Sequence, residues 1–125
     1  MHFAYWMLLA AGMLPYLTIF FVKHAGRDRF DNHRPRAWME TLDGWQQRGD
    51  WAHRNHFEVF PLFAAAVLVA ETTGGAQGMI DGLAGCFVVV RVIYTGLYLA
   101  DLAALRSLVW MVGLVFTIWL FALGA

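Results

Sequence analysis

The sequence has little charge: only 14% of its 125 residues are Asp, Glu, Lys or Arg, whereas 60% are hydrophobic. The mean hydropathy of +0.54 also lies outside the usual range of a soluble globular domain. The net charge is zero, so the chain lacks the basic excess that a nucleic-acid surface requires. Its single cysteine, Cys86, excludes a disulfide framework and a CxxC metal site, and we expect a packed, inert thiol there. What remains is a membrane protein.

Four apolar segments, at about residues 3–22, 53–70, 79–99 and 105–123, predict transmembrane helices. The first lacks a positive n-region and a small-x-small cleavage site, which argues against a cleaved signal peptide. Short turns at 72–78 and 101–104 join the last three segments, so successive helices are antiparallel. The predicted fold class is all-α: an integral membrane four-helix bundle that forms one domain over residues 1–125.

A polar loop at about residues 23–50 joins the first two segments and carries six of the nine Lys and Arg residues. Since cytoplasmic loops are enriched in these residues, we expect this loop in the cytoplasm and both termini on the far side. Its tryptophans predict contact with lipid headgroups and a short helix near 37–47. The loop and the following segment contain the histidines His24, His33, His53 and His56. No third ligand stands at a recognisable spacing from the last two, so no metal site is expected.

Polar side chains interrupt three of the four segments at one predicted depth, near the cytoplasmic surface. They are Arg54, Asn55 and Glu58 in the second segment, Arg91, Tyr94 and Tyr98 in the third, and Arg106 and Ser107 in the fourth. Helical spacing places the members from the second segment on one face and those from the third on another, while Arg106 and Ser107 open the fourth segment. Because ionisable groups in a membrane are costly and are retained mostly for function, we expect a binding site for a polar, anionic ligand.

Arg91 lies deepest in this set, about eight residues or ~12 Å inside the end of its helix, and must therefore face protein and be paired. Glu58 is the carboxylate that reaches a similar depth, so the residues predict an Arg91–Glu58 ion pair. The simplest role of such a pair is to fix the helix register without any ligand. The other residues also have structural interpretations: interfacial anchoring for Arg54, Arg106, Tyr94 and Tyr98, and interhelical hydrogen bonding for Asn55.

Three runs, HRNHFEVFP at 53–61, RVIYTGLY at 91–98 and LRSLVW at 105–110, resemble the signature segments of the MAPEG family, the membrane-associated proteins in eicosanoid and glutathione metabolism. The resemblance extends over all four helices in order and length. It is closest to small bacterial members, including FDNHRPR at 30–36. It implies a homotrimer, which we expect in a bacterial inner membrane, with glutathione held between neighbouring subunits near the cytoplasmic face.

The resemblance also implies roles for individual residues. Arg106 matches the arginine credited with activating the glutathione thiol, and the glutathione-contacting positions are matched by Arg54, Asn55, Glu58, Arg91, Tyr94, Tyr98 and Ser107. A thiol with a pKa of about 8.5 is mostly protonated at neutral pH, and a nearby guanidinium favours the nucleophilic thiolate. The expected activity is that of a glutathione-dependent transferase or peroxidase, with glutathione as cosubstrate, acting on lipophilic electrophiles or lipid hydroperoxides.

Two other functions remain open. A MAPEG-like membrane protein without glutathione chemistry would bind a lipid or another anionic amphiphile through the same arginines. A small transporter would use Glu58 as a proton or substrate site, although its position near one surface argues against alternating access. The expected partners are further copies of the chain, membrane lipids and a lipophilic small molecule, with no nucleic acid.

Overall fold

The computed structural model covers residues 1–125 and is entirely helical. Its helices are α1 (Phe3–Ala25), α2 (Pro35–Glu40), α3 (Gly44–Thr73), α4 (Gln77–Leu99) and α5 (Ala103–Leu123). All except α2 are long and apolar enough to cross a membrane. The predicted fold class, an all-α membrane protein with four transmembrane helices, is confirmed.

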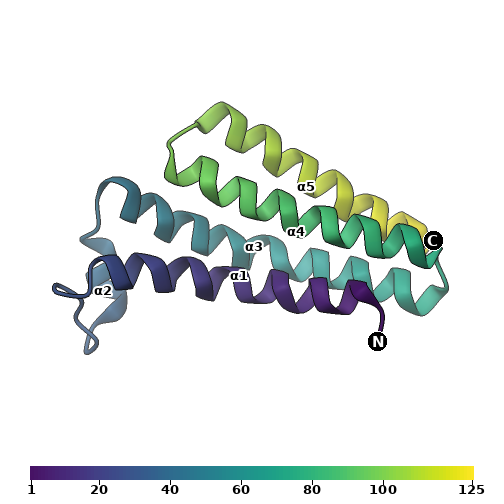
Figure 1. Cartoon of the computed structure of the whole chain (residues 1–125), viewed down its shortest axis with the longest axis horizontal. Helices are drawn as coiled ribbons and strands as arrows, with labels where there is room; N and C mark the ends of the chain where they lie inside the picture. The colour runs from purple at the N-terminus through teal and green to yellow at the C-terminus, as the bar shows by residue number, and fades with distance from the viewer.

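The four long helices form an antiparallel bundle in which α3 and α4 are central. Each of these two contacts the other and both outer helices, whereas α1 and α5 lie on opposite sides and do not touch. Both chain termini lie at one end of the bundle, and α2 lies at the other end together with the turn between α4 and α5 (Figure 1). We call the latter the α2 end.

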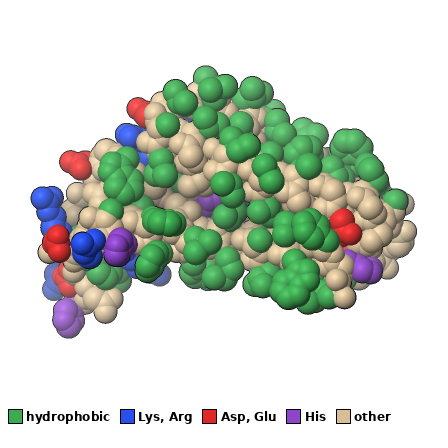
Figure 2. Space-filling model, viewed as in Figure 1, with side chains coloured by type: hydrophobic (Ala, Val, Ile, Leu, Met, Phe, Trp, Pro, Cys, Tyr) green, Lys and Arg blue, Asp and Glu red, His purple; other side chains and the backbone are tan.

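The core lies where the central helices meet. The rings of Phe63 and Phe87 stack at 3.8 Å between centroids, and small buried residues such as Ala66 and Ala84 let the helix backbones approach. Large apolar side chains cover much of the outside, and charged groups gather at the α2 end (Figure 2). Cys86 also points outward, so the expectation of a packed thiol is wrong. An apolar sequence around a residue does not show which face of its helix is buried.

The second transmembrane helix begins earlier than hydropathy indicated. The apolar segment was expected from residue 53, but α3 begins at Gly44. Its polar first part packs against α1 at Gly49, where an added Cβ would lie 2.5 Å from Val22 Cγ2. Arg48 donates from Nε (3.2 Å) and Nη2 (3.0 Å) to the Leu99 carbonyl at the end of α4. Hydropathy detects only the apolar part of this helix. The contacts of Gly49 and Arg48 stabilise the helical conformation of the polar residues that precede that part. The short helix expected near 37–47 is instead α2 followed by the start of α3.

Two of the helix connections use residues with a positive φ angle. Gly74 ends α3 at φ 82°, a conformation that glycine adopts without steric cost. Asp101, in the turn between α4 and α5, has φ 61°, which aspartate tolerates better than most other side chains. The second turn brings the start of α5 back beside the end of α4. Residues of α4 and α5 therefore face one site.

Candidate functional site

Arg91 on α4 is the centre of a polar network inside the bundle. It is only 2% exposed, and its guanidinium contacts two side chains of α3. Nη2 donates to Asn55 Oδ1 at 2.9 Å, while Nε and Nη2 lie 3.3 and 3.1 Å from His56 Nδ1. The prediction that Arg91 faces protein is confirmed.

The predicted ion pair between Arg91 and Glu58 is wrong. The two side chains are connected through Asn55, whose Nδ2 donates to Glu58 Oε2 at 3.0 Å. Because arginine can only donate and a carboxylate only accepts, these two partners determine the orientation of the amide. The sequence indicated that both charges share a depth in the membrane. Depth does not determine which direction a residue faces, and Asn55 and His56 take the positions next to Arg91.

Arginine and tyrosine side chains alternate along the α4 side of the site. The guanidinium carbon of Arg91 lies 4.1 Å from the centroid of the Tyr94 ring, and that of Arg106 lies 4.3 Å from the centroid of Tyr98. The two tyrosine rings meet edge to face at 5.6 Å. These cation–π contacts hold both guanidinium groups without a carboxylate partner. Arg106 makes no side-chain hydrogen bond within the chain, so all its N–H donors are free.

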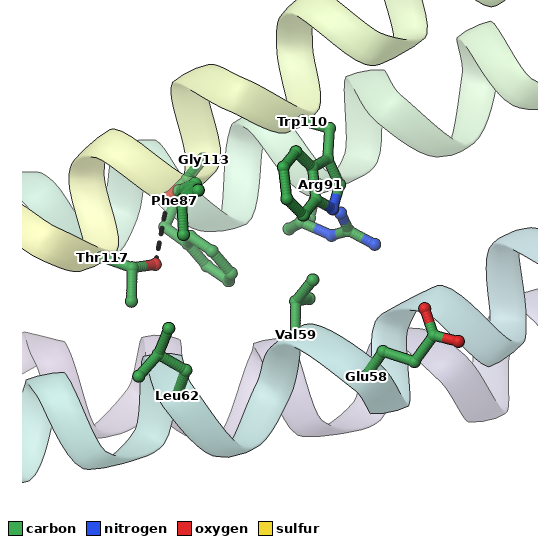
Figure 3. A pocket seen from close by; sticks show the side chains of 9 residues that line it. Glu58, Val59, Leu62, Phe87, Arg91, Trp110, Gly113 and Thr117 are labelled. Atoms are coloured by element: carbon green, nitrogen blue, oxygen red, sulfur yellow. Dashed lines mark hydrogen bonds between the residues drawn. The ribbon is translucent and has the colours of Figure 1, made fainter.

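Two adjoining pockets open beside this network. The first, which we call the polar pocket, has a volume of about 300 Å³ and is lined by Asn55, Tyr94, Tyr98, Arg106, Ser107, Trp110 and Met111. The second, the apolar pocket, has a volume of about 270 Å³ and is lined by Glu58, Val59, Leu62, Phe87, Arg91, Trp110, Gly113, Leu114 and Thr117. Trp110 belongs to both. In Figure 3, Glu58 and Arg91 lie at one end of the apolar pocket, while Leu62 and Thr117 lie at the other.

Most of the residues that the sequence singled out lie on these two pockets. Arg54 lies on neither: its Nη2 lies 3.0 Å from Asp50 Oδ2, and its side chain is 55% exposed. Sequence reasoning missed Asp50, which is only 3% exposed. The four-residue spacing between Asp50 and Arg54 on a helix was a usable signal for this pair. It was not recognised because residues before 53 were assigned to a loop.

His56 was also missed as a member of this network. The sequence predicts a solvated or hydrogen-bonded histidine at this position but no partner for it. Its ring is buried between Arg91 and Thr95, the latter one helical turn further along α4. No spacing rule within one helix finds such a contact, because the partners come from two helices.

The network and the pockets together offer an unusual combination of groups at membrane depth. The guanidinium of Arg106 and several hydroxyls line the polar pocket, while the guanidinium of Arg91 and the carboxylate of Glu58 line one end of the adjoining apolar pocket. This arrangement suits a small zwitterionic or anionic molecule, with room beside it for an apolar one.

Comparison with known families gave one match. The model of the MAPEG family matches residues 3–125, which is essentially the whole chain. Neither the comparison with curated proteins nor that with solved structures gave a match.

Proposed function

The chain belongs to the MAPEG family, and we propose that it is a glutathione-dependent membrane transferase or peroxidase acting on lipophilic electrophiles or lipid hydroperoxides. The observation that carries this proposal is the unpaired guanidinium of Arg106. It lies over Tyr98 on the wall of the polar pocket, with no carboxylate partner and no hydrogen bond in the chain. Its charge is therefore available to a ligand.

The groups around the pockets suit glutathione, which has two carboxylates, one ammonium group and a thiol. Arg91 has one nitrogen, Nη1, that contacts neither His56 nor Asn55 and can bind a carboxylate. Glu58 is exposed and accepts from Asn55 through one oxygen only, so its other oxygen is free for the ammonium group. Ser107 adds a hydroxyl to the polar pocket. One carboxylate and the ammonium group of the cosubstrate thus each have an oppositely charged counterpart, and the hydroxyl of Ser107 can donate to the second carboxylate.

Arg106 is the residue that we assign to thiol activation. A guanidinium remains positively charged at every relevant pH, so it stabilises a thiolate whenever one forms beside it. The thiolate then attacks the electrophilic carbon and displaces its leaving group, or attacks a hydroperoxide oxygen, which breaks the O–O bond and gives the sulfenic acid of glutathione and, after protonation, an alcohol.

The part of the apolar pocket away from Glu58 and Arg91 is our candidate site for the lipophilic acceptor. This pocket adjoins the polar pocket at Trp110, and Val59, Leu62 and Phe87 supply most of its apolar wall. An apolar substrate that enters from the bilayer would therefore have its reactive group near the polar pocket.

Arg54 lies outside both pockets. We propose that the protein is a homotrimer and that Arg54 lies at a contact between its subunits. The polar loop that precedes this residue would then face the cytoplasm.

The test compares glutathione binding and thiolate formation in the purified, detergent-solubilised protein and two variants. Arg106→Ala removes the proposed activating charge. Arg36→Ala, at an exposed position of helix α2 outside both pockets, removes an equivalent charge elsewhere. Calorimetry measures binding, and ultraviolet difference absorbance measures the thiolate. We expect a thiolate signal in the wild type and in Arg36→Ala, and its loss in Arg106→Ala.

An undiminished thiolate signal in Arg106→Ala would show that another group activates the thiol. If the wild type binds no glutathione but purifies with a lipid, the chain is a binding protein for anionic amphiphiles that uses the same arginines.

A further inference from the structure

We propose that His56 is a positioning residue, which fixes the guanidinium of Arg91 for ligand binding as a neutral hydrogen-bond acceptor. The role in ligand binding rests on the proposed function, whereas the contact itself does not. Both side chains are 2% exposed and they meet between α3 and α4, where neither has access to bulk water. Two nitrogens of Arg91, Nε at 3.3 Å and Nη2 at 3.1 Å, face the same ring nitrogen, His56 Nδ1.

The partners on either side determine the protonation of the ring. Arg91 can only donate, so Nδ1 must carry a lone pair, and the proton of the neutral imidazole must be on Nε2. Nε2 lies 2.8 Å from Thr95 Oγ1 and donates to it, and the Thr95 hydroxyl in turn donates to the Arg91 carbonyl at 2.9 Å. The direction of each hydrogen bond from Arg91 through His56 to Thr95 is thereby fixed. Protonation of Nδ1 would remove the acceptor and place two cations together.

This arrangement orients Arg91 without neutralising it. Nε and Nη2 are used by His56 and Asn55, which leaves Nη1 outside both contacts. A carboxylate in place of His56 would hold the guanidinium equally well but would cancel its charge. A neutral imidazole keeps the full positive charge for an anionic ligand. We infer that this is why a histidine, and not an acidic residue, contacts Arg91.

The test uses variants that keep or remove the acceptor. In His56→Asn the amide oxygen can take the place of Nδ1, whereas His56→Leu offers no acceptor. Thr95→Val removes the hydroxyl that holds Nε2. Its matched control, Thr18→Val, removes another partly buried threonine hydroxyl, which bonds only to the carbonyl four residues earlier in its own helix. Calorimetry measures glutathione affinity, and thermal unfolding in detergent identifies variants that fail to fold.

We expect His56→Leu to weaken glutathione binding by about 10- to 100-fold, the effect of one hydrogen bond to a charged group. His56→Asn should bind nearly as the wild type does, Thr95→Val should be intermediate, and Thr18→Val should be unchanged. In an Arg91→Leu background, His56→Leu should cause no further loss, because its effect is exerted through Arg91. A purely structural role predicts equal losses in both backgrounds. Equal losses, or a folded His56→Leu with wild-type affinity, would overturn the proposal.

Nitrogen-15 NMR of the ligand-free protein tests the contact itself. Labelled histidine should show an unprotonated Nδ1 and a protonated Nε2 for His56, and the Arg91 Nε–H signal should shift in His56→Leu. A protonated Nδ1 would refute the inference even if glutathione binds. A wild type that binds no glutathione would overturn the proposed function instead, and the NMR result would still decide whether His56 fixes Arg91.

Discussion

Replacing Asn55 with aspartate should separate the stability of the network from its function. Asn55 lies between two opposite charges, with Oδ1 2.9 Å from Arg91 Nη2 and Nδ2 3.0 Å from Glu58 Oε2. Asn55→Asp keeps the shape of the side chain but turns the donor that faces Glu58 into an acceptor. The introduced carboxylate would attract Arg91 and repel Glu58 at almost the same distance.

The two electrostatic changes nearly cancel. At an effective dielectric constant of about 20, unit charges 2.9 and 3.0 Å apart each interact by roughly 5.5 kcal/mol, with opposite signs here. Because Glu58 is exposed, water screens the repulsion and the side chain can turn away, so these values are upper bounds. We therefore expect Asn55→Asp to fold with a free energy of unfolding no lower than that of the wild type.

Glutathione binding should nevertheless fall in Asn55→Asp. Glu58 leaves the position in which it would accept the ammonium group, and the positive charge of Arg91 is neutralised. The loss of one charge-assisted contact, about 1.5–3 kcal/mol, corresponds to roughly 10- to 100-fold in affinity. Calorimetry measures the affinity, and thermal unfolding in detergent measures stability.

Two further variants test whether the attraction to Arg91 and the repulsion from Glu58 act as described. Asn55→Leu removes both hydrogen bonds and leaves a buried N–H of Arg91 without its acceptor, so it should cost about 1–3 kcal/mol of stability. In a Glu58→Gln background, Asn55→Asp should become stabilising, because the repulsion is gone and the new amide can donate to the introduced carboxylate. The reasoning is refuted if Asn55→Asp is as unstable as Asn55→Leu, or if it binds glutathione with wild-type affinity.

Two glycines give further predictions. At Gly113 an added Cβ would lie at an ordinary 3.5 Å from Val90 Cγ1, so Gly113→Ala should fold but fill part of the 270 Å³ apolar pocket. We expect it to raise the KM for a long-chain lipid hydroperoxide about tenfold or more while leaving glutathione affinity unchanged, and an equal effect on both would argue against separate pockets. At Gly49 an added Cβ would lie 2.5 Å from Val22 Cγ2, so Gly49→Ala should lower the free energy of unfolding by ~1–3 kcal/mol. Gly82→Ala, where nothing lies within 4 Å, should instead leave it equal or higher in the same thermal unfolding assay.

Much of the site could be predicted because its residues are polar where the surrounding sequence is apolar. Arg91 is an example: a cation so far inside an apolar segment has to face protein. Its partner could not be predicted in the same way. Hydropathy and helical spacing give the depth of Glu58 but not the rotation of α3 relative to α4, and that rotation places Asn55 and His56 beside Arg91.

The start of α3 shows the same limit for the fold. Residues 44–52 carry no continuous apolar signal, and their helical conformation is supported by the packing of Gly49 against Val22 and by the hydrogen bonds of Arg48 to α4. Assigning them to a loop concealed the pair between Asp50 and Arg54. Both contacts of Gly49 and Arg48 join residues that are distant in sequence.

The sequence by itself therefore determined that the chain folds in a membrane, that its fold class is all-α, and that the polar residues share one depth along their helices. Long uncharged segments are stable only in lipid, where a helix satisfies its own backbone, and short turns make successive helices antiparallel. The tertiary structure decided which polar groups pair, because pairing depends on the rotation and offset of each helix against its neighbours. It also decided that Arg106 is left without a partner and that a neutral histidine, not a carboxylate, holds Arg91.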